Sequence, residues 1–229
     1  TKYLGVAHLI ILISHENIDL SIDVINLIRE LFDYELDQES YDMVTQLYDV
    51  FVSEGIFSII FRLEKLVEAL VSNLSRFNEE KPEESEAVHK SLNIIEHILE
   101  LKPLMAQYMV DNTKILPWLI QRLSPKYPFD DNKLYASEIL AILIQGSREN
   151  QFSFGKLGGI DNLLSTLAVR DIFLILYYLG IQKTDPKVEE EREMIENIFD
   201  VLCASLLVRD NQDLFAKGEG VELMIRMLK

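Results

Sequence analysis

One apolar helical pattern recurs five times along the chain, and it constrains the fold more than any other feature of the sequence. Each copy places apolar residues at positions i, i+3, i+4 and i+7, which lie on one face of an α-helix. The copies begin at residues 6, 67, 116, 160 and 221. Recurrence at such intervals is typical of a repeat protein, in which each repeat adds a similar set of helices to its neighbour.

A longer helix is predicted after each of the first four copies, and these helices share a polar position as well as their apolar ones. Each carries one polar residue directly before two apolar residues. The four members of this polar column are Asn26, Asn93, Glu138 and Asn197. The best formed of these helices lies in residues 128–145, where Asp130, Asp131 and Asn132 suit the start of a helix. Amphipathic spacing explains the apolar positions, whereas the shared polar position indicates true repeats.

A third, shorter element precedes some copies. Residues 154–160 (FGKLGGI) align with residues 215–221 (FAKGEGV), and residues 41–53 and 103–112 fill the same place in other repeats. Three helices per repeat at this length indicate armadillo repeats, with HEAT repeats as the alternative. We therefore predict an all-α fold: a right-handed superhelical solenoid of about four to five armadillo or HEAT-like repeats. Residues 1–229 are expected to form a single armadillo-repeat domain and to be a fragment of a longer chain.

Residues 170–188 interrupt the repeat pattern. They are predicted to be an insertion between the second and third helices of the fourth repeat, and their first half is strongly apolar. This half could form an extra helix packed on the solenoid or an exposed segment that binds a partner. We favour packing, because an exposed apolar run of this kind promotes aggregation. The sequence leaves the role of residues 170–183 open.

The charge of the chain limits its partners. Asp and Glu number 38 against 22 Lys and Arg, a formal net charge of -16. Such a surface repels phosphates and anionic lipids, so we expect no direct binding to nucleic acid or to a membrane. Basic protein segments are favoured partners, although an acidic surface also serves simply to keep a protein in solution. The apolar run at residues 172–181 is too short to span a bilayer.

Catalytic and metal-binding patterns were sought next. The four histidines fall in no HExxH or comparable ligand spacing, and the sequence contains neither a phosphate-binding glycine loop nor a GxSxG motif. Cys203 stands alone among apolar neighbours and is expected to be a small core residue. We predict a protein that is not an enzyme and that holds no cofactor and no metal.

The polar column is the best candidate for a binding surface. In an armadillo stack the third helices line the concave face, where amides can hold a peptide backbone and carboxylates can hold Lys or Arg side chains. Glu96 and Asp200 lie one turn further along their helices and share this face. Trp118 is a further contact candidate, although packing against a neighbouring repeat explains it equally well. The predicted partner-binding residues are Asn26, Asn93, Glu96, Glu138, Asn197, Asp200 and Trp118. The alternative is that the column consists of ordinary outward positions on amphipathic helices.

Several stretches resemble the beta-catenin-like protein 1 family. They are residues 128–145 (PFDDNKLYASEILAILIQ), 158–167, 217–229, 21–33 and 191–207. The resemblance implies a nuclear armadillo-repeat scaffold associated with pre-mRNA splicing and the spliceosome, which binds basic nuclear-localisation segments of splicing-factor proteins. It also implies that a homodimer is possible. Residues 170–183 depart from the family pattern.

The sequence leaves more than one hypothesis of function open. The first is a non-catalytic protein-binding scaffold of the nucleus that recruits basic segments of splicing proteins. The second is an importin-alpha-like nuclear transport receptor, which would use the same groove. Receptors of that class carry Trp-Asn pairs on successive third helices, whereas here the single tryptophan, Trp118, is predicted on a second helix. A third hypothesis, from a different class, is an enzyme regulator or an unrecognised enzyme, which an added domain outside the fragment or a bound cofactor would support.

Overall fold

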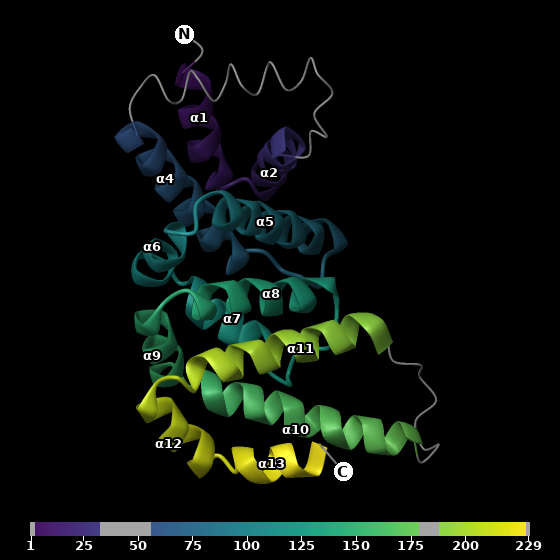
Figure 1. Ribbon diagram of the computed structural model, residues 1–229. Coiled ribbons are helices and arrows are strands. Elements are labelled where there is room, and N and C mark those ends of the chain that lie inside the picture. Colours follow the sequence, from purple (N-terminus) through teal and green to yellow (C-terminus); the bar gives the residue numbers. More distant parts are fainter. Residues whose placement is uncertain (1–2, 33–55, 179–187, 228–229) are drawn as a thin grey trace, which may run out of the picture. The chain divides into compact units, whose positions relative to one another are not determined.

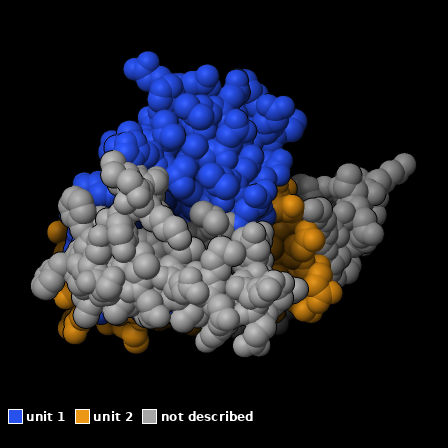
Figure 2. Space-filling view, turned by 90° about the horizontal axis from the view of Figure 1, so that it is seen from above, with its two compact units in different colours: residues 1–114 blue, residues 115–229 orange. Residues whose placement is uncertain are grey.

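The computed structural model describes the backbone of residues 3–32, 56–178 and 188–227, and the side chains of residues 8–30, 63–169 and 189–227. Within these ranges all regular secondary structure is helical, which confirms the predicted all-α fold (Figure 1). The helices gather into two compact units, residues 1–114 and residues 115–229 (Figure 2).

Unit 1 holds the first set of repeats. Its helices are α1 (Tyr3–Ile13), α2 (Ile18–Phe32), α4 (Ile56–Leu74), α5 (Pro82–Leu101) and α6 (Met105–Asn112). Helices α1 and α4 carry the five-fold apolar pattern, and α2 and α5 are the predicted longer third helices. Helix α2 packs on α5, and α4 packs on α1, α5 and α6. The short element predicted at residues 41–53 lies outside the described residues.

Unit 2 holds the remaining helices of the repeats. Its helices are α7 (Ile115–Arg122), α8 (Asp131–Gln145), α9 (Arg148–Lys156), α10 (Gly159–Tyr178), α11 (Val188–Ser205), α12 (Arg209–Lys217) and α13 (Gly220–Met227). Helix α8 packs along α11, while α9 lies against α12 and α10 against α13. The order first, second and third helix is complete in α9, α10 and α11, as the armadillo pattern predicts.

The predicted apolar columns form the core of each unit. Ile94 and Ile95 in unit 1, and Ile139 and Ile198 in unit 2, are completely buried. Leu27, with 44% of its surface exposed, and Phe199, which is half-buried, are exceptions. Helical spacing therefore identified the buried face of the third helices in both units.

Residues 170–178 correct one prediction. They form no separate helix packed on the repeats, since they continue α10 without a break to Tyr178. The backbone of α10 is 20 residues long, against 8 residues for the second helix α7. The remainder of the expected insertion, residues 179–187, lies outside the described residues.

Buried amides connect successive repeats in unit 2. Asn150 Nδ2 donates to the carbonyl of Leu143 (2.8 Å), and Asn211 Nδ2 donates to that of Ser205 (2.9 Å). Gln151 and Gln212 bind the carbonyls of Ile144 and Leu206 in the same way. Carbonyls at the C-terminus of a helix lack intrahelical donors, so each first helix closes the end of the third helix before it.

A charged cluster fixes the start of α8. Asp130 is the N-cap residue and accepts from the backbone N–H of Lys133 (2.8 Å), as predicted. Its carboxylate also binds Arg122 Nη2 through both oxygens at 2.6 Å. The ammonium of Lys133 donates to the carbonyls of Ser124 (2.9 Å) and Tyr127 (2.7 Å). The turn between α7 and α8 is therefore held by side chains from both of its ends.

Candidate partner-binding surface

The polar column of unit 1 lies on the neighbouring helices α2 and α5. Asn26 is half-buried, and its Oδ1 accepts a hydrogen bond of 2.9 Å from Lys90 Nζ. Lys90 also forms an ion pair of 2.7 Å with Glu86. Asn93 is buried, with 7% of its surface exposed. In this unit, Asn26 of the polar column thus connects α2 to α5 through the ammonium group of Lys90.

Glu96 is the one carboxylate among the predicted site residues of unit 1. It lies one turn beyond Asn93 on α5 and is half-buried. Burial, and then the negative charge of Glu100, raise the pKa of Glu96, while His97 acts in the opposite direction. A cation bound beside Glu96 would favour the charged carboxylate and lower this pKa again.

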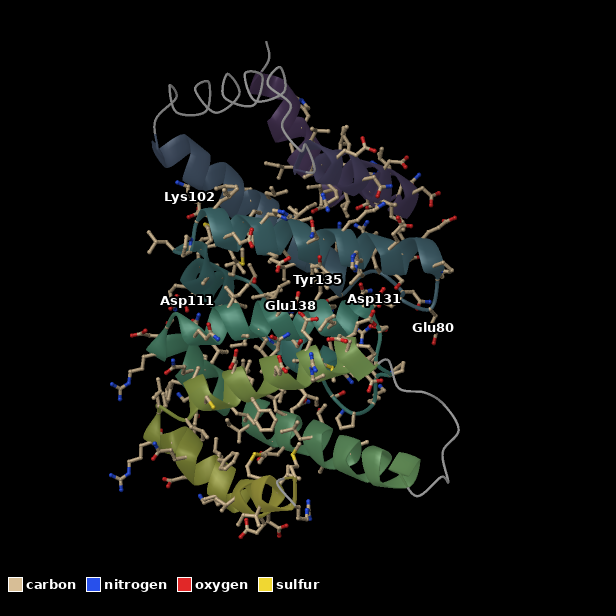
Figure 3. All side chains as sticks on the ribbon, turned by 45° about the vertical axis from the view of Figure 1, so that its right-hand side comes forward. Glu80, Lys102, Asp111, Asp131, Tyr135 and Glu138 are labelled. Carbon is tan, nitrogen blue, oxygen red and sulfur yellow. The ribbon has the colours of Figure 1, made fainter. Side chains whose placement is uncertain are left out.

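The column of unit 2 is more acidic. Asp131, Tyr135 and Glu138 follow one another along α8 and share one of its faces (Figure 3). Asp131 is exposed, and the other two side chains are half-buried. The face therefore presents an aromatic ring between two carboxylates.

Helix α11 adds its own polar residues next to α8. Asn197 Nδ2 donates to Ser137 Oγ at 3.0 Å, which ties the third helix of one repeat to that of the next. Glu193 and Asp200 are exposed on either side of Asn197 in the sequence. We call the following residues the α8–α11 surface: Asp131, Tyr135, Glu138, Glu193, Asn197 and Asp200. Four of the six carry a negative charge and none a positive one.

Part of the charge on α11 is neutralised within the helix. Arg192 forms ion pairs with Glu189 (2.9 Å) and Glu196 (3.5 Å), and all three side chains are largely exposed. Exposed pairs of this kind contribute little to stability.

Trp118 lies elsewhere in unit 2. It belongs to α7, a second helix, and it is half-buried. Its place on a second helix is the one predicted. Trp118, the four residues of the polar column, Glu96 and Asp200 stay predicted partner contacts.

Cys203 corrects a prediction. It was expected in the core, but its side chain is exposed on α11. Its neighbour Leu202 is the buried member of this turn, with 2% of its surface exposed. Because successive residues of a helix point about 100° apart, the apolar residues around Cys203 did not decide its own direction.

The buried residues Lys133 and Arg122 were not among the predicted functional residues. Each has 4% of its surface exposed. Burial, and then the positive charge of Arg122, lower the pKa of Lys133 to about 8, although Asp130 opposes this shift. Arg122 also lies over the ring of Tyr127, 5.3 Å from its centroid. This cluster supports the start of α8 and thereby positions Asp131 and the rest of its face.

In the described part of the chain, no group of three or more His, Cys, Asp or Glu side chains is placed to hold a metal ion. None of the described helices is both long and apolar enough to cross a membrane.

Comparison with known proteins places the chain in a family. A family model described as catenin-beta-like, Arm-motif containing nuclear matches residues 1–229. The chain belongs to the beta-catenin-like protein 1 family. Beta-catenin-like protein 1 of Homo sapiens is 39% identical over 225 residues, and that of Rattus norvegicus shows the same identity over the same length.

The similarity extends to fungi. The beta-catenin-like protein 1 homolog of Schizosaccharomyces pombe is 31% identical over 219 residues. The match with the mammalian proteins covers 98% of this chain but 36% of theirs. The chain thus spans about a third of the length of these beta-catenin-like relatives. Armadillo motifs are part of the family description and agree with the three-helix repeats.

Proposed function

We propose that this protein is a non-catalytic scaffold of the nucleus, associated with pre-mRNA splicing, and that its α8–α11 surface binds basic, nuclear-localisation-type segments of splicing factors. Membership of a family described as nuclear supports the location. The net charge of -16 favours basic partners over nucleic acid.

The observation that carries the proposal is the composition of the α8–α11 surface. Asp131 and Glu138 flank the ring of Tyr135 on α8, and Asp200 lies on the adjacent α11. Carboxylates form charge-assisted hydrogen bonds with Lys and Arg, and a tyrosine ring attracts a cation placed over its face. The surface of unit 2 is therefore better suited to a basic peptide than that of unit 1, where Lys90 already donates a hydrogen bond to Asn26.

Fluorescence anisotropy of a labelled Lys/Arg-rich peptide against the 229-residue chain tests the proposal. We expect saturable binding that weakens as salt is raised, because exposed charges are screened. Glu138→Lys should weaken binding at least tenfold with unchanged helicity by circular dichroism.

A charge-matched control separates local contact from overall attraction. Asp213 is exposed on α12, and Asp213→Lys changes the net charge by the same amount as Glu138→Lys. We expect it to weaken binding less than twofold. Equal losses in the two variants, or no binding even at low salt, would remove the assignment of the α8–α11 surface.

A further inference from the structure

A second feature of unit 2 lies away from the third helices. A cavity of about 230 Å³ opens between α10 and the turn that joins α12 to α13. Leu164 and Leu223 form its apolar part, and each has 4% of its surface exposed. Asp161, Glu219 and Arg226 are exposed and line the same cavity. An apolar floor below two carboxylates and one guanidinium suits a long side chain that ends in a charge.

The backbone at Glu219 is unusual. Its φ is 58°, and it is the one non-glycine residue with positive φ in the described part of the chain. The repeat pattern aligns Glu219 with Gly158, whose φ is 77°. Only glycine adopts this conformation without steric cost. One repeat therefore uses glycine at this turn, whereas the other holds a carboxylate in a disfavoured conformation at the edge of a cavity.

Gly218 brings this turn close to α10. A Cβ on Gly218 would lie 2.9 Å from Leu164 Cδ1 and 3.4 Å from an oxygen of Asp161. A side chain here would push the turn away from α10 or fill the space beside Leu164. Gly218 thus lets the turn approach α10 closely, and Glu219 places a negative charge at the same turn.

We propose that this cavity binds a lysine or arginine side chain of a partner protein. The methylene groups of that side chain lie on Leu164 and Leu223, and its charged end lies between Asp161 and Glu219. Two carboxylates and one guanidinium give the lining of the cavity a net negative charge, which favours a positively charged ligand. The site is separate from the α8–α11 surface and does not rest on the function proposed for it.

Amide NMR spectra of the 229-residue chain provide the test. The probe is an acetylated, amidated peptide of alanine and serine with one central lysine, and the control peptide has norleucine in its place. Gly218 and Gly220 report from the turn, while Gly146 and Gly155 report from other turns and helices. We expect the lysine peptide to shift Gly218 and Gly220 in a saturable manner and the norleucine peptide to shift them at least tenfold less.

Glu219→Gly is the decisive variant, because glycine tolerates the positive φ and the aligned turn already contains Gly158. We expect its melting temperature not to fall and its affinity for the lysine peptide to drop at least fivefold. Three results would overturn the proposal: no shift at Gly218 and Gly220, unchanged affinity in Glu219→Gly, or shifts confined to α8 and α11. Glu138→Lys should leave this binding unchanged, which separates the site from the α8–α11 surface.

Discussion

The side-chain amide of Asn211 donates a hydrogen bond of 2.8 Å to the backbone carbonyl of Gln151, which lies one repeat earlier in the chain. The same amide binds the carbonyl of Ser205, and 1% of the Asn211 surface is exposed. One buried side chain therefore joins α12 both to α9 and to the end of α11.

Asn211→Ala should destabilise the protein by about 2–3 kcal/mol, because the carbonyls of Gln151 and Ser205 each lose a hydrogen bond from a buried amide. Urea unfolding followed by circular dichroism measures this change. Gln212→Ala is the matched control: Gln212 makes one comparable bond to Leu206 but is exposed. Its expected cost is below about 1 kcal/mol. Similar costs for both variants would show that the contact of Asn211 with α9 contributes nothing.

Gly155→Ala should also destabilise the protein, by about 1–3 kcal/mol. A Cβ at residue 155 would lie against Asn211 Oδ1, so either the amide or the helix must move. In the background of Asn211→Ala this conflict disappears, and the second substitution should cost much less. A double-mutant cycle measures the coupling. Additive effects would mean that the packing of α9 on α12 does not depend on this contact.

Tyr108→Phe should cost about 1 kcal/mol, because Tyr108 Oη donates a hydrogen bond of 2.6 Å to Glu68 between α6 and α4. The bond to Glu68 raises the pKa of Tyr108 to about 12. A raised pKa stabilises the fold below the unfolded value near 10, and this contribution is lost as the pH rises through 12. In the ultraviolet difference spectrum at pH 10.5, Tyr108 should remain protonated. A titration of all tyrosines near pH 10 would contradict this.

Lys133 should make stability depend on pH in the opposite sense. Its folded pKa of about 8 lies below the ordinary lysine pKa of 10.5, so above pH 8 the unfolded chain binds more protons than the folded one. Stability should therefore rise between pH 8 and 10 relative to a variant without this ammonium. The measurement is urea unfolding of the wild type and of Lys133→Met at pH 7.5, 8.5 and 9.5. A constant difference between the two proteins would show that Lys133 keeps its ordinary pKa.

The sequence predicted the repeats well because their signal is periodic. Third helices at α2, α5, α8 and α11, and the cap at Asp130, follow from spacing and from the chemistry of helix starts. The pairs Asn150-Gln151 and Asn211-Gln212 were also visible as a repeated dipeptide after an acidic residue. Apolar columns do not predict their role, because both residues of each pair are polar.

Other features depend on tertiary contacts that no local pattern records. Lys133 can be buried because carbonyls of the preceding turn accept hydrogen bonds from its ammonium group, and nothing in its neighbours in sequence indicates this. Cys203 was predicted to be buried, but the buried position is that of its neighbour Leu202. The uninterrupted length of α10 was missed because a departure from the repeat was interpreted as a separate element.

The amides of Asn150 and Asn211 also bear on where one repeat ends. Since the first helices α9 and α12 donate to carbonyls at the ends of the third helices α8 and α11, cutting the chain between either pair would remove donors from these backbone groups. The energetic module is then second, third and first helix, a circular permutation of the conventional armadillo order. The division between the two compact units follows the same frame, since it falls between Lys114 and Ile115, after first helix α6 and before second helix α7. Shortened versions of this protein should accordingly stop after a first helix.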